Sequence, residues 1–173
     1  MSALNRINLQ VESLMSAYGP VCTGNYFRAK KIPSISFLNY LVRLQKFMHC
    51  SDECFVVALI YIKRLKESEP QLDMSPFTVH RIFLAAVVTA TKFLDDQFYL
   101  NSYYAKVGGV SVLELKNLEL SFLSILDYNL NVSQEEYHTE FSALFKESFL
   151  NSTKSCYVQP ANQLEFSSTV SNA

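Results

Sequence analysis

The stretch AAVVTATKFLDD, residues 85–96, is an apolar helical run that ends in one lysine and two aspartates. The carbonyl groups at a helix C-terminus favour cations, so Lys92 suits this end of the run whereas Asp95 and Asp96 do not. Lys92 and Asp96 are also spaced in the weaker orientation for an ion pair within one helix. We therefore expect these charged side chains to make contacts outside their own helix.

The helix predicted over residues 76–95 has little polar surface. At about 100° per residue, one face carries Phe83, Val87, Ala90 and Leu94, and the opposite face carries Arg81, Ala85, Val88, Thr89 and Lys92. Because both faces are largely apolar, we expect a central helix that is surrounded by others.

Helical periodicity continues on both sides of this stretch, and we find no convincing strand and no internal repeat. Apolar spacing predicts further helices over residues 3–18, 34–49, 52–67, 101–107, 111–127 and 133–149. Glycine and proline at residues 19–20, and two glycines at residues 108–109, are expected to end two of them. The predicted fold class is therefore all-α.

Serine residues stand where four of these helices are expected to begin. The predicted N-caps are Ser51, Ser75, Ser111 and Ser133. Pro76 would occupy the first helical position behind its serine. Glu114 and Glu136 would complete capping boxes, in which the serine and the glutamate each bond an exposed amide of the first turn.

Size and charge argue against several classes of function. The 173 residues suit one domain with tails, and a net charge of −1 gives no basic excess for nucleic acid. The short basic segment RAKK, residues 28–31, is interpreted as a solvated linker. The longest apolar run, residues 82–90, is far below the roughly 18 residues of a membrane span. We expect an intracellular chain, in the cytoplasm and/or the nucleus, that binds neither nucleic acid nor membrane.

Catalytic and metal-binding patterns are not found. The four cysteines, Cys22, Cys50, Cys54 and Cys156, form no CxxC pair, so we expect reduced thiols rather than a metal site. His80 is expected to be a core or cap-side histidine, and Asp95 with Asp96 lacks the nearby third carboxylate of a magnesium-binding pair. No nucleophile elbow, phosphate loop or zinc-protease motif is present. We predict no enzymatic activity, no cofactor and no small-molecule substrate.

A second charge stands on an apolar helix face. In the helix predicted over 111–127, Glu119 lies near the middle of a stripe formed by Leu115, Phe122, Leu123 and Leu126. An unpaired buried carboxylate costs several kcal/mol, so Glu119 needs a partner, and Lys92 is the natural one. Two interpretations stay open. The pair serves only to stabilise the fold, or both charges stand at the rim of an apolar patch and offer hydrogen bonds to another chain.

Several segments in the same order resemble one known family. They are IPSISFLNYLVRLQKF (32–47), VHRIFLAA (79–86), KFLDD (92–96), YAKVGGV (104–110) and LELSFLSILDYNL (118–130). Together they resemble the cyclin box, and more narrowly the fungal phosphate-pathway cyclins and the plant P/U-type cyclins. The resemblance implies a single five-helix cyclin box over residues 32–131. An N-terminal helix with a linker (1–31), a C-terminal flanking helix (132–150) and a mobile tail (151–173) are expected around it.

The resemblance also implies a function. Cyclins bind a cyclin-dependent protein kinase and have no catalytic activity of their own. The family's kinase-contacting lysine and glutamate fall on Lys92 and Glu119, which there hold backbone of the kinase loop before its regulatory helix. The implied apolar contacts are Phe93, Leu123, Tyr128 and Leu130. Asp95 and Asp96 either add polar contacts at the rim or cap the next turn. The alternative is a cyclin-fold interaction or transcription-factor module without a kinase partner.

Two departures from the family pattern bear on the fold. Many cyclins pair an arginine at the start of the first box helix with an aspartate in the second, but these positions hold Ser34 and Lys63 here. Other contacts must therefore fix the first box helix. The substrate-docking patch of mitotic cyclins also lacks its sequence, so docking at that place is not expected.

Overall fold

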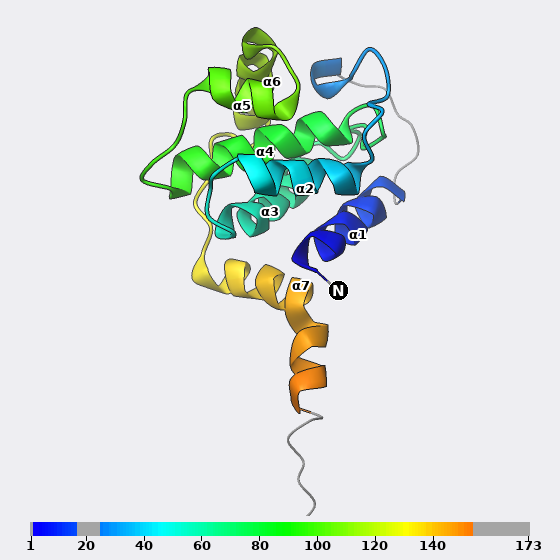
Figure 1. Ribbon diagram of the computed structural model, residues 1–173, viewed down its shortest axis with the longest axis vertical. Coiled ribbons are helices and arrows are strands. Elements are labelled where there is room, and N and C mark those ends of the chain that lie inside the picture. Colours follow the sequence, from blue (N-terminus) through cyan, green and yellow to red (C-terminus); the bar gives the residue numbers. More distant parts are fainter. Residues whose placement is uncertain (1, 17–24, 154–173) are drawn as a thin grey trace, which may run out of the picture.

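The computed structural model describes residues 2–16 and 25–153, and within these ranges it contains helices and no strand (Figure 1). The elements are α1 (Ala3–Ser16), the 3-10 turn η1 (Asn25–Phe27), α2 (Phe37–Phe47), α3 (Glu53–Ser68), α4 (Val79–Leu94), α5 (Asn101–Gly108), α6 (Val112–Ile125) and α7 (Gln134–Thr153). Five helices, α2 to α6, lie between residues 32 and 131, and α1 and α7 flank them. The all-α prediction is confirmed.

Helix α4 crosses the middle of the molecule in Figure 1. Twelve of its sixteen residues are buried, in an almost unbroken run from Val79 to Thr91. Helix α3 packs along α4, and α5 and α6 also pack against it. Each fully buried Val, Leu, Ile or Phe side chain contributes about 1.5–3 kcal/mol. Burial on all sides explains why both faces of this helix are apolar.

The flanking helices cover a different side of the core. Helix α7 packs on α3 and on α1, and α1 packs on α2. The buried side chains on this side include Leu4, Ile7 and Val11 of α1 and Leu144 of α7. Figure 1 shows α1 and α7 on one side of α3, whereas α4, α5 and α6 lie on the other. The box and its flanking helices therefore share one core.

Helix α2 is held by α5 rather than by an arginine–aspartate pair. Four hydrogen bonds join the two helices: Tyr40 Oη to the Gly108 carbonyl (3.1 Å), Arg43 Nε to the Val107 carbonyl (2.8 Å), Arg43 Nη2 to the Lys106 carbonyl (3.2 Å), and Tyr103 Oη to the Phe47 carbonyl (2.7 Å). The last carbonyls of a helix have no intrahelical partner, so side chains of α2 satisfy carbonyls that α5 would otherwise leave open.

Lys63 of α3 forms an ion pair with the flanking helix α7. Lys63 Nζ lies 2.5 Å from a carboxylate oxygen of Glu140 on α7. The neighbouring Arg64 pairs with Glu136 at 2.5 Å and donates to the carbonyls of Asn129 and Asn131. The segment that carries an internal aspartate in many cyclins thus ties α3 to α7 and to the loop before it.

Two predicted helix starts are wrong. The Ser51 side chain does not cap α3, because its hydroxyl donates to Asp95 at 2.7 Å, and the N-cap position is Asp52. Helix α4 begins at Val79, three residues later than predicted, after a turn that holds Pro76. This turn is closed by the hydroxyl of Thr78, which donates to the Asp73 carbonyl at 2.6 Å.

The basic segment at 28–31 exposes its charged side chains, while apolar residues in and beside it pack on the core. Phe27 is buried and meets the ring of Phe122 edge-on, and the amide of Ala29 donates to the Phe77 carbonyl at 2.8 Å. Arg28 pairs with Asp73 at 3.0 Å. Arg28, Lys30 and Lys31 are exposed, as the solvated interpretation expects, whereas Phe27 and Ala29 beside them reach the core.

Both ends of the chain continue beyond the described helices. Helix α7 extends to Thr153, past the predicted boundary at residue 150. The remaining tail, residues 154–173, and the predicted helix stop at residues 19–20 lie outside the described residues. No described helix is long and apolar enough to cross a membrane.

Candidate kinase-binding site

Lys92 and Glu119 form an ion pair that a third residue completes. Lys92 Nζ lies 2.5 Å from Glu119 Oε1, and it also donates to Oδ1 of Asn101 at 2.5 Å. The amide nitrogen of Asn101 donates to Glu119 Oε2 at 2.5 Å. The pairing predicted from the sequence is present, and α4, α5 and α6 each supply one member.

The pair stands between the core and the solvent. The side chain of Glu119 keeps 11% of its exposure and that of Lys92 keeps 28%. Lys92 lies in the last turn of α4, where a cation suits the helix dipole. The Glu119 carboxylate is placed on an otherwise apolar face, and its two oxygens are both bonded, which offsets the cost of removing them from water.

Asn101 is the functional candidate that sequence reasoning missed. It is the first residue of α5, directly after an exposed loop that ends in Leu100. Asparagine at the start of a helix is usually interpreted as a cap, so its type and position gave no sign of a bond to a residue on another helix. Only the packing of α5 beside α4 and α6 brings it to the pair.

A small hollow of about 140 Å³ opens beside the pair. Its lining residues are Thr89, Lys92, Phe93, Glu119, Leu123 and Leu130. Five of the six predicted site residues therefore lie around one hollow, which brings together α4, α6 and the loop after α6. Thr89 is buried at this place, and its hydroxyl has no hydrogen-bond partner among the described residues.

Tyr128, the sixth predicted residue, does not line the hollow but is tied to it. Its amide donates to the Leu123 carbonyl at 3.0 Å, while the Asp127 amide donates to the Ser124 carbonyl at 3.2 Å. These two bonds form the Schellman motif that ends α6. Tyr128 has a φ of 57°, which is rare for a bulky residue, and its side chain is 64% exposed. The chain thus holds an aromatic ring in solvent at the cost of backbone strain.

Exposed apolar side chains surround the pair. Phe93 is 50% exposed and Leu120 is 59% exposed, and Leu94 also faces solvent. Leu120 was not singled out from the sequence, although its position three residues before Leu123 places both on neighbouring parts of one α6 face. Large apolar residues gathered at a surface mark a place where another molecule binds.

Comparison with known proteins decides the family. A sequence model of the cyclin domain matches residues 10–130. The chain belongs to the cyclin family. It is 42% identical to Cyclin-U4-1 of Arabidopsis thaliana over 137 residues. These aligned residues make up 79% of this chain and 68% of the relative.

Other relatives fall in the same groups. Cyclin-P4-1 of Oryza sativa subsp. japonica is 40% identical over 121 residues, 70% of this chain and 57% of the relative. PHO85 cyclin-7 of Saccharomyces cerevisiae is 37% identical over 131 residues, 69% of this chain and 46% of the relative. The predicted resemblance to plant P/U-type and fungal cyclins is confirmed. This cyclin spans between 46% and 68% of the length of these three relatives.

Asp95 has a structural task in this cyclin that neither sequence-based alternative foresaw. Its carboxylate accepts from the Ser51 amide at 3.0 Å and from the Ser51 hydroxyl at 2.7 Å. It therefore fastens the end of α4 to the residue that precedes α3, rather than capping its own next turn. Asp96 is exposed. Polar contacts of either aspartate with a partner stay a prediction.

Two cysteines and the buried histidine of this cyclin are part of its packed interior, whereas Cys22 and Cys156 lie outside the described residues. Cys50 and Cys54 are free thiols, and Cys54 is buried beside Asp95. A hydrogen bond with Cys50 and burial raise the pKa of the Cys54 thiol. His80 is 8% exposed and its ring packs between those of Phe37 and Tyr40. The expectation of a core histidine is confirmed.

Proposed function

We propose that this cyclin binds and activates a cyclin-dependent protein kinase through the surface around the hollow beside Lys92 and Glu119. The observation that carries the proposal is the arrangement of a part-exposed ion pair, a small apolar hollow and exposed aromatic side chains on one surface. One relative is itself named as a cyclin of PHO85, which supports a kinase as the partner.

The ion pair has bonding capacity to spare for a partner. An ammonium group has three N–H donors, and two of those on Lys92 are used by Glu119 and Asn101. Each oxygen of the Glu119 carboxylate accepts one hydrogen bond and has room for a second. The pair can therefore stabilise the fold and still offer one donor and two acceptors to the backbone of a kinase loop. The two interpretations left open by the sequence are compatible.

The proposed mechanism is a shift of population. An active kinase requires the lysine of its third strand to pair with a glutamate of its regulatory helix. A rigid helical surface that fits this helix in its inward position favours the active arrangement. Phe93, Leu123 and Tyr128 supply most of the binding energy, while Lys92 and Glu119 fix the register. The cyclin itself catalyses nothing and works in the cytoplasm or nucleus, where such kinases act.

One observation favours the alternative of an interaction module without a kinase. Asn101 accepts a hydrogen bond from Lys92 and donates one to Glu119, so the pair has a partner within the chain, as a purely structural role requires. The exposed rings distinguish the two proposals, because Phe93 and Tyr128 are half or more in solvent and stabilise the monomer little.

The test uses the exposed rings, since their loss leaves the core intact. The full chain, co-expressed with each cyclin-dependent kinase of its source cell, is analysed by gel filtration and by phosphate transfer to a model peptide. We expect one kinase to co-elute and become active, and Phe93→Ala or Tyr128→Ala to weaken the complex about 30-fold, the effect of losing a hot spot of about 2 kcal/mol.

Leu9→Ala is the matched control, because Leu9 is 51% exposed on α1, a helix that takes no part in the hollow. It should bind the kinase as the unchanged chain does. Failure of every kinase to co-elute, or equal weakening by Leu9→Ala and Phe93→Ala, would favour the module without a kinase partner.

A further inference from the structure

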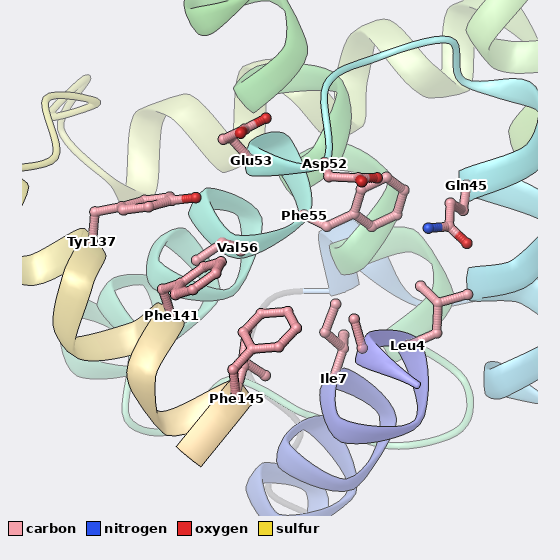
Figure 2. Close-up of a pocket in the computed structure, with 12 residues that line it drawn as sticks. Leu4, Ile7, Gln45, Asp52, Glu53, Phe55, Val56, Tyr137, Phe141 and Phe145 are labelled. Atoms are coloured by element: carbon pink, nitrogen blue, oxygen red, sulfur yellow. The ribbon is translucent and has the colours of Figure 1, made fainter. Parts of the chain in front are cut away.

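A second and larger hollow lies between the two flanking helices and α3. It has a volume of about 210 Å³ and is lined by residues of α1, α3 and α7, by Gln45 of α2 and by Asp52 (Figure 2). Typical small-molecule pockets measure about 300–1,000 Å³, so this groove is too small for most of them. It is still several times the roughly 30 Å³ that a water molecule occupies, so one or two apolar side chains fit.

The groove has an apolar floor and an aromatic wall. Leu4, Ile7, Phe55 and Val56 form the floor and are at most 8% exposed. The wall is a ladder of rings at every fourth residue of α7, where Tyr137 stacks on Phe141 at 6.0 Å and Phe141 stacks on Phe145 at 4.4 Å. Figure 2 shows these rings along one side of the groove, and Phe141 is 36% exposed.

Charge differs between the two ends of the groove. Asp52 and Glu53 stand exposed together at one end, and neither forms an ion pair within the described residues. Burial raises the pKa of Tyr137, and the nearby Glu53 charge adds to this effect. At the other end Arg6 donates to the Leu144 carbonyl and lies over the Phe145 ring. The acidic end is therefore the one that can attract an incoming charge.

We propose that this groove binds a short segment of a second protein that carries lysine or arginine next to a leucine or an aromatic residue. The apolar side chain enters between α1 and the α7 ladder, and the cation lies against Asp52 and Glu53. Recognition of an apolar anchor by a groove between helices, with charge fixing the register, follows known modes of peptide binding.

The cyclin's own tail is a poorer occupant. Helix α7 runs eight residues past Phe145, which is about 12 Å at 1.5 Å per residue. An extended chain needs about four residues to cover that distance again, so only residues from about 158 onward can reach the groove. Residues 158–173 contain no lysine or arginine, and their one charged residue is Glu165. This segment does not complement an acidic rim.

The groove is separate from the surface proposed to bind the kinase. It is built by α1, α7 and the outer face of α3, whereas Lys92, Glu119 and the smaller hollow belong to α4, α5 and α6. The core helices α3 and α4 lie between them. A peptide can therefore occupy the groove while a kinase is bound, and the inference does not require the proposed function.

The test begins with a library of random twelve-residue peptides displayed on phage and selected on the full chain, with counterselection on Phe141→Glu. We expect enrichment of peptides with lysine or arginine within a few residues of leucine or an aromatic residue. A synthetic, fluorescent copy of the most enriched peptide should then bind the full chain in a polarisation assay. Phe141→Glu should weaken it at least tenfold.

Variants of the acidic end decide the charge argument. Asp52→Asn with Glu53→Gln should weaken the peptide about fivefold at low salt and less at high salt, as for exposed charge pairs. Glu67→Gln with Glu69→Gln removes two exposed acids at the far end of α3 and should change nothing. Asp52→Lys with Glu53→Lys should instead select acidic peptides, a gain that loss of folding cannot imitate. Phe93→Ala should leave peptide binding unchanged.

Three results would overturn the proposal. The first is enrichment of peptides without basic residues. The second is binding that Phe141→Glu does not weaken. The third is binding that emerges only after deletion of residues 154–173, which would assign the groove to the tail.

Discussion

At the residue scale, Lys92 and Glu119 show how one pair can be structural and still available. The carboxylate is mostly buried and each of its oxygens accepts one hydrogen bond, while the ammonium retains more exposure and a free donor. Their position and sign could be predicted from the sequence, because a charge on an apolar helix face demands an opposite charge. Asn101 could not, since its role depends on how three helices meet.

The two halves of this pair should differ in their effect on stability. Lys92→Met leaves the Glu119 carboxylate with Asn101 as its sole bonded donor, so we expect a loss of about 1–2 kcal/mol in the free energy of unfolding. Glu119→Gln keeps the shape and removes the charge, and should cost less. Urea denaturation of both variants measures this. Should both variants unfold at the same urea concentration as the unchanged chain, the pair would add little to stability and would serve only the binding of a partner.

His80 should make stability depend on pH. Burial lowers its pKa and the charge of Arg81 lowers it further, while the bond from the ring to the Ile35 carbonyl acts in the opposite direction. A histidine with a lowered pKa takes up its proton on unfolding, so stability is full above about pH 6.5 and falls as the pH drops below it.

The expected decline is no steeper than about 1.4 kcal/mol per pH unit. It should flatten in His80→Gln and persist in His138→Gln, since His138 is exposed on α7. Urea midpoints between pH 7 and pH 5 supply the measurement. An equal decline in all three chains would assign the effect to other groups.

At the element scale, helix ends set by local sequence were predictable and those set by remote contacts were not. Ser111 and Ser133 accept from the third amide of α6 and α7, at 3.1 and 3.2 Å, as the capping-box pattern indicates. The box glutamates, however, turn away to arginines: Glu114 to Arg81 and Glu136 to Arg64. The predicted start of α3 was wrong for the same reason, because the hydroxyl of Ser51 bonds to Asp95, 44 residues away in the sequence, and not to the first turn of the helix.

The glycine pair that ends α5 makes two separable demands. Gly109 has a φ of 73°, and a methyl group added there would meet no neighbouring atom. Gly109→Ala therefore causes only backbone strain, which should lower the free energy of unfolding by about 1 kcal/mol. At Gly108 a Cβ would lie 2.3 Å from Leu84 Cδ2, so α5 and α4 would have to shift or repack. We expect Gly108→Ala to cost about 1–3 kcal/mol.

A double-mutant cycle with Leu84→Ala separates these causes. Leu84→Ala makes room for the new methyl group, so it should offset part of the loss caused by Gly108→Ala and none of that caused by Gly109→Ala. Chemical denaturation of the five variants provides the free energies. Additive effects at Gly108 would show that its contact with Leu84 costs nothing.

At the scale of the whole molecule, the order and number of helices followed from periodicity and stop residues, but the joining of the box to its flanks did not. From the sequence, Lys63 indicated only that the arginine–aspartate pair of many cyclins is missing. The structure shows that it reaches Glu140 on α7, so the flanking helix contributes charge partners that the sequence pattern of the box alone does not reveal. The domain boundaries at residues 31 and 131 stay predictions.

Truncation tests whether the box is independent of α7. Deleting residues 154–173 should leave the free energy of unfolding and kinase binding unchanged, because the described core and the surface proposed to bind the kinase are formed by residues 4–145. Deleting residues 132–173 exposes the surface beneath Leu144, worth about 1.5–3 kcal/mol, and leaves Lys63 and Arg64 without Glu140 and Glu136. Each lost pair adds up to about 1 kcal/mol, so we expect a loss of about 2–5 kcal/mol in urea denaturation. If the shorter chain instead unfolds within about 1 kcal/mol of the full chain, α7 is an appendage of an autonomous box rather than part of its core.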